Sequence, residues 1–145
     1  MMTTLVKTFA AVALVTLGSI TMAADKPEKS MVNLSTANLA IGQYIEIITK
    51  GQSIGLEQLF ASDFNQKVQG THAKTNSRSE LINFFKKQKG ERLNCKTTTQ
   101  ILETSKDYAI AKVIMQFDSF TKIDIVTLIN DKGTWKITDS VTSYK

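Results

Sequence analysis

The strongest constraint on the fold is a change in hydrophobic periodicity near Cys95. Before it, apolar residues recur at the three- and four-residue spacing of helices, and after it they alternate every second residue, as in strands. Strand-like runs lie near residues 95–104, 108–118, 121–130 and 134–144. The connections between them are so short that neighbouring strands must be antiparallel. The C-terminal half is therefore predicted to be a four-stranded antiparallel meander.

Helical segments precede this meander. The first begins after Asn33, with Ser35 or Thr36 as candidate caps and Gly51 as a left-handed stop. A short second helix follows, and a third begins with the capping box at 77–80 and runs to Gly90. The range 63–70 resembles a short strand, and 71–76 a polar loop. Helices followed by an antiparallel sheet predict an α+β fold.

The N-terminus has the pattern of an export signal. Lys7 is followed by an uncharged apolar run, and the small residues Thr21 and Ala23 occupy the −3 and −1 positions of a cleavage site. We expect a signal peptide at 1–23, a flexible lead-in at 24–32 and a single domain at 33–145. The apolar run is at the short limit for a membrane span. The mature chain is therefore predicted to be periplasmic or secreted and to leave the membrane after cleavage.

The composition argues against several classes of protein. The chain has one cysteine, Cys95, and one histidine, His72, so neither an internal disulfide nor the usual metal cluster is expected. The formal charge is +5, and basic residues gather between Lys86 and Lys96. That run is explained by a helix C-terminus, and it lacks the interleaved aromatic residues of single-strand binders. We therefore expect no nucleic-acid partner and no cofactor.

The two central strand-like runs are apolar on both sides. In 108–118, Ile110 and Ile114 oppose the main apolar face, and 121–130 shows the same feature. A sheet with one solvated face should alternate more cleanly. We expect helices on one face and a second copy of the chain on the other, which makes the protein a homodimer. The alternative is that central strands tolerate scattered exposed apolar residues.

Passages along most of the mature chain resemble a known superfamily. They are QYIEIITKG at 43–51, LEQLFASD at 56–63, SELINFF at 79–85 and NDKGTWKI at 130–137. Their order and spacing resemble the nuclear transport factor 2-like, or cystatin-like cone, superfamily, in particular its exported "putative lumazine-binding" and polyketide-cyclase-like members. The resemblance implies helices packed in a strongly curved antiparallel sheet, with a pocket at the open end.

The same superfamily includes ketosteroid isomerases, whose mechanism needs a tyrosine, an aspartate base and a protonated aspartic acid. Tyr44 falls where the isomerase tyrosine would lie. The base position falls near 66–68, which has no carboxylate, and the acid position falls near Ile125 and Val126, which are apolar. The chain is therefore not expected to be a steroid isomerase, and no catalytic residue is assigned.

Aromatic residues and one acid are the candidates for lining the pocket. Strand alternation along 134–144 places Trp135, Ile137 and Asp139 on one side of the strand. If Trp135 faces the pocket, Asp139 should therefore face it as well. Alternatively, Asp139 lies at a bulge or rim or pairs with a lysine, and the aromatic residues belong to the core. The predicted ligand-binding residues are Tyr44, Phe60, Met115, Phe117, Trp135 and Asp139.

These residues support a non-catalytic domain that binds a small apolar ligand, with Tyr44 and Asp139 orienting it. One alternative is an enzyme of the polyketide-cyclase or dehydratase type, with Asp139 as general acid and base. Another is a periplasmic protein-interaction domain whose cone is filled by side chains. Superfamily membership does not decide between them, because function depends on the site.

Overall fold

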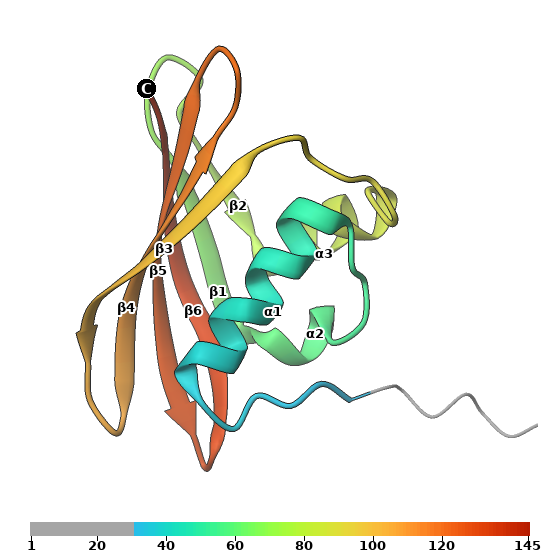
Figure 1. The fold of residues 1–145 in the computed structure, drawn as a ribbon. Coiled ribbons are helices and arrows are strands. Elements are labelled where there is room, and N and C mark those ends of the chain that lie inside the picture. Colours follow the sequence, from blue (N-terminus) through green and yellow to red (C-terminus); the bar gives the residue numbers. More distant parts are fainter. Residues whose placement is uncertain (1–30) are drawn as a thin grey trace, which may run out of the picture.

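A computed structural model describes residues 31–145 (Figure 1). The signal peptide expected at 1–23 and most of the lead-in at 24–32 lie outside the described residues, so both stay predictions. Among residues 31–145, no helix is both long and apolar enough to cross a bilayer.

The first helix, α1 (Ala37–Lys50), begins and ends at predicted residues. Of the two candidate caps, Thr36 is the one used, and its hydroxyl oxygen accepts a hydrogen bond from the Leu39 amide at 3.2 Å. Gly51 ends the helix with a φ of 64°. A Cβ at Gly51 would lie 2.6 Å from backbone atoms of Gln88 and Gly90. Glycine is required here both by the left-handed backbone and by the close approach of the segment after α3.

The region between the first and third helices contains more strand than predicted. After α2 (Leu56–Leu59), strand β1 (Phe60–Val68) begins earlier than the predicted strand, and β2 (Lys74–Ser77) replaces the last part of the predicted loop. Strand β2 was missed because it is short and polar, with no apolar alternation. The capping box at the start of α3 (Arg78–Lys87) is confirmed, with Ser77 as the N-cap. The backbone amide and hydroxyl of Ser77 bond the Glu80 carboxylate and lower its pKa.

The predicted meander is confirmed, and it forms part of a larger sheet. Strands β3 (Lys96–Thr104), β4 (Tyr108–Gln116), β5 (Thr121–Asp131) and β6 (Thr134–Tyr144) are antiparallel neighbours. The six-stranded order is β2-β1-β6-β5-β4-β3, because β1 pairs with β6 in parallel. The three helices of residues 31–145 lie on one face of this curved, open sheet (Figure 1), which confirms the predicted α+β fold.

The core lies between α1, α2 and this face of the sheet. Side chains from alternate positions of β4, including Ala111, Val113 and Met115, are fully buried there. On the opposite face, Ile110, Ile114 and Ile125 are half-buried within the single chain. The expectation that a second copy covers this outer face stays a prediction.

A bulge in β6 changes which residues face the helices. Leu128 pairs with Ile137, but its neighbour Thr127 pairs with Asp139, so β6 contains one extra residue at Thr138. The buried side of β6 consequently moves from Trp135 and Ile137 to Ser140 and Thr142. The unbroken alternation predicted for 134–144 is wrong. Asp139 is half-buried and shares the outer face with Thr127 rather than the side that carries Trp135.

Candidate functional site

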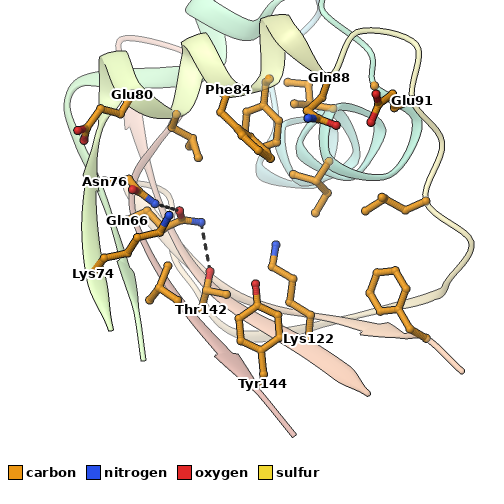
Figure 2. Close-up of a pocket in the computed structure, with 18 of the residues that line it drawn as sticks. Gln66, Lys74, Asn76, Glu80, Phe84, Gln88, Glu91, Lys122, Thr142 and Tyr144 are labelled. Atoms are coloured by element: carbon orange, nitrogen blue, oxygen red, sulfur yellow. Dashed lines mark hydrogen bonds between the residues drawn. The ribbon is translucent and has the colours of Figure 1, made fainter. Parts of the chain in front are cut away.

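A cavity of about 580 Å³ opens between α3, the end of α1 and the strands β1, β5 and β6. Figure 2 shows it with α3 above and the strands below. Helix α3 turns Leu81, Phe84 and Phe85 toward the cavity, because residues at this spacing share one helix face. The walls are mainly apolar and include Ile47, Ile48, Leu93, Phe117 and Phe120.

Aromatic side chains surround the cavity and remain partly in solvent. Phe84 is 53% exposed, Phe120 42% and Tyr144 54%. Phe117 and Phe120 stack with ring centroids 4.5 Å apart, and Tyr144 lies 6.1 Å from Phe120. Large exposed aromatic side chains grouped at an opening are typical of a contact surface for a ligand or partner.

The floor of the cavity is polar and is connected by hydrogen bonds (Figure 2). Asn76 Nδ2 donates to Gln66 Oε1 at 2.8 Å, and Gln66 Nε2 donates to Thr142 Oγ1 at 3.2 Å. Lys122 also lines the cavity, and its amino group extends into the open space in Figure 2. Thr142 reaches this floor because of the β6 bulge, which turns Thr142 inward and Asp139 outward.

Asp124 lies behind the floor and is fully buried. Tyr44 donates its hydroxyl hydrogen to Asp124 Oδ2, and Thr142 donates to Asp124 Oδ1, each at 2.7 Å. Lys122 Nζ lies 3.3 Å from Asp124 Oδ2. A buried carboxylate requires such donors and a compensating charge. Asp124 therefore holds together residues from α1, β5 and β6.

The pKa of Tyr44 is raised well above its usual value, first by burial and then by the neighbouring Asp124 carboxylate. The phenol therefore stays protonated at neutral pH and serves as a donor to Asp124. Tyr44 is 2% exposed and does not line the cavity. Its contribution to the site is to fix Asp124, which in turn fixes Lys122.

Of the six residues predicted to line the pocket, Phe117 does so. Tyr44, Phe60, Met115 and Trp135 belong to the buried core, where Tyr44 and Phe60 meet edge to face. Asp139 lies on the outer face and does not line the cavity. The structure thus places Tyr44 at the site through Asp124, and Phe117 directly.

Sequence reasoning missed the polar residues of the floor. The isomerase acid was expected near Ile125 and Val126, which are apolar, whereas the buried acid is the preceding residue, Asp124. The available signal was an acid inside the apolar run from Ile123 to Leu128. Gln66 lies where the isomerase base was expected, and it lines the cavity with an amide instead of a carboxylate. The carboxylates that line the cavity are Glu80 and Glu91, and both are solvent-exposed.

His72 is exposed, and Cys95 is a half-buried free thiol that packs against the core. Within residues 31–145, no group of three or more His, Cys, Asp or Glu side chains could hold a metal ion.

Solved structures with the same architecture support a shared fold. A protein of unknown function from Pectobacterium atrosepticum has a TM-score of 0.62 at 18% identity, covering 77% of this chain and 90% of its own. A nuclear transport factor 2-like protein of unknown function from Silicibacter pomeroyi has a TM-score of 0.58 at 19% identity, covering 74% and 90%.

A structure described as a putative ketosteroid isomerase from Parabacteroides distasonis has a TM-score of 0.58 at 14% identity, covering 81% of this chain and 97% of its own. At these identities the likeness concerns the fold alone. No curated protein matches the sequence significantly.

A family described as "putative lumazine-binding" matches residues 33–141, which is most of the domain that the structure describes. The match and the shared architecture agree with the resemblance carried by the sequence passages. The chain therefore belongs to this family, and its fold is that of the nuclear transport factor 2-like structures.

Proposed function

We propose that this protein is a non-catalytic binding domain whose cavity holds one small, mainly apolar molecule. The observation that carries the proposal is a cavity of about 580 Å³ with apolar walls and a few connected polar groups at its floor. Sites for small molecules have this size and this distribution of polar groups. Phe84, Phe117 and Phe120 supply flat surfaces for the apolar body of the ligand.

The enzyme alternative rested on Asp139 as the general acid and base. A catalytic carboxylate must reach its substrate. Asp139 lies on the outer face of the sheet and does not line the cavity, so it does not support this alternative. The binding function needs no such group and is the better supported of the two.

A panel of small apolar molecules tests the proposal by thermal shift. A ligand that binds only the folded state raises the melting temperature, and the rise grows with the logarithm of the ligand concentration above Kd. Val68 lines the cavity, so we expect Val68→Trp to place an indole ring in it and to reduce the shift. The control is Leu102→Trp, which adds the same side chain at an exposed position of β3. Shifts of undiminished size in Val68→Trp, or a panel without any shift, would contradict the proposal.

We also propose that the protein acts after export, on the basis of the apolar run that follows Lys7 and the small residues at Thr21 and Ala23. Expression of the full chain in a bacterium, followed by mass spectrometry of the secreted and periplasmic fractions, tests this. The expected product starts at Ala24. An intact N-terminus in the cytoplasmic fraction alone is the opposing result.

A further inference from the structure

Asp124 determines the direction of every hydrogen bond in the cavity floor. A carboxylate can only accept, so the hydroxyl hydrogen of Thr142 is committed to Asp124 Oδ1 at 2.7 Å. The Thr142 oxygen is then left as an acceptor, which explains why Gln66 presents its amide nitrogen to it at 3.2 Å. With its nitrogen turned toward Thr142, Gln66 uses its oxygen to accept from Asn76.

This arrangement leaves N–H donors of Lys122 and Gln66 available to a ligand at the floor. An ammonium group carries several N–H bonds. Among residues 31–145, the ion-pair partner of Lys122 Nζ is Asp124, at 3.3 Å. An amide nitrogen carries a second N–H, so Gln66 Nε2 has one left after its bond to Thr142. Both side chains line the cavity (Figure 2).

The charge at this place also favours an acceptor. The Lys122 side chain is 19% exposed, whereas its partner Asp124 is fully buried behind it. A ligand in the cavity therefore meets the ammonium before the carboxylate. Glu80 and Glu91 also line the cavity, but they are solvent-exposed, so water screens them more strongly than the floor.

We propose that the ligand is an apolar molecule bearing a carboxylate or a comparable oxyanion, which accepts hydrogen bonds from Lys122 Nζ and Gln66 Nε2 at the cavity floor. The apolar body lies against the aromatic side chains of Phe84 and Phe117. Asp124 acts as a positioning residue, since it holds Lys122 and orients Gln66 through Thr142. This inference rests on the proposed binding function and specifies the class of ligand.

The test uses two probes of nearly equal shape, 2-naphthoate and 2-naphthamide, whose affinities are measured by isothermal titration. A hydrogen-bonded ion pair in a partly desolvated site should make the naphthoate bind about tenfold tighter or more. We expect the double variant Lys122→Met/Asp124→Asn to remove this preference, because it deletes the donor without leaving a buried unpaired carboxylate. Its affinity for 2-naphthamide should stay close to that of the wild type.

Two further variants provide controls. Lys112→Met makes the same change at a half-buried lysine of β4 that does not line the cavity, and it should keep the full preference. Gln66→Leu removes the amide donor, together with the bonds to Thr142 and Asn76, and should reduce the preference while leaving Lys122 in place. Circular dichroism of each variant shows whether it is folded. If the double variant does not fold, the affinities of the wild type and of Gln66→Leu for the two probes still test the inference.

The outcomes distinguish this inference from the proposed function. A clear preference for naphthoate that depends on Lys122 supports the inference. Equal affinity for the two probes, or a preference that persists in the folded double variant, overturns it and leaves the binding function standing. If the wild type binds neither probe, the inference and the proposed function both fail for ligands of this kind.

Discussion

The two ends of the helix-facing side of the sheet are built differently, although the same strands run through both. At one end, Leu128, Trp135 and Ile137 belong to the apolar core that also includes residues of α1 and α2. At the other end, Gln66, Lys122 and Thr142 lie under an open cavity. The bulge at Thr138 separates the two ends, because it changes the residues of β6 that face inward. One inserted residue thus allows a single strand to contribute both to the core and to a polar site.

The largest expected effect tests the packed end. Ile137 is fully buried, so Ile137→Ala should leave a cavity and lower the free energy of unfolding by about 4 kcal/mol. Val68 is half-buried at the open end, so Val68→Ala should lower the free energy of unfolding by only about 1 kcal/mol, because little packing is lost. Urea denaturation measures both. Equal losses would mean that the two ends are packed alike.

Asp124→Ala tests the polar end. It leaves the Tyr44 hydroxyl and Lys122 without their shared partner, and we expect a loss of about 3 kcal/mol. Asp124→Asn retains the shape and should cost less. Urea denaturation of the two variants separates loss of the side chain from loss of the charge. A change below about 0.5 kcal/mol for Asp124→Ala would show that the network contributes little to folding.

Tyr44→Phe should lower the free energy of unfolding by about 1 kcal/mol at neutral pH. Because burial and Asp124 raise the pKa of Tyr44, the folded state retains a proton that the unfolded state releases above about pH 10. This stabilisation is fully present below the unfolded pKa and is lost as the pH rises through the folded value. The wild type should therefore lose stability more steeply than Tyr44→Phe as the pH rises above about 10. Parallel pH profiles would contradict the shifted pKa.

The smallest expected change in folding concerns the outer face. If a second copy covers Ile125, then Ile125→Lys should convert a dimer to a monomer, as measured by light scattering. The stability of the monomer should change by no more than about 0.5 kcal/mol. Ile54→Lys, at an exposed position before α2, is the matched control and should leave the mass unchanged. A monomeric wild type would end the dimer hypothesis.

The sequence predicted the elements whose signals are local. The Thr36 cap, the Gly51 stop, the capping box at Ser77 and the meander all depend on residues close together in the chain. Strand β2 was missed because a short polar edge strand has no periodic signal. The parallel pairing of β1 with β6 joins segments far apart in the sequence, and no local pattern specifies it.

The site was harder to predict because it depends on a bulge. Alternation was the basis for grouping Asp139 with Trp135, and one extra residue at Thr138 reverses that grouping. Phe117 was correctly predicted to line the cavity because it continues the alternation of Val113 and Met115, and no bulge interrupts the pairing of β4 with β5. Lys122 and Asp124 lie two residues apart on one side of β5, but Tyr44 and Thr142 reach Asp124 from α1 and β6, so no local pattern specifies the complete network.

The most direct test of a ligand site at the open end is a ¹⁵N NMR titration of the protein with 2-naphthoate. We predict saturable shifts of the backbone amides of Gln66, Phe117 and Lys122, with Ile110 and Ile125 on the outer face unchanged. Shifts confined to the outer face would contradict the account. The absence of any shift at the cavity, up to the solubility limit of 2-naphthoate, would contradict it as well.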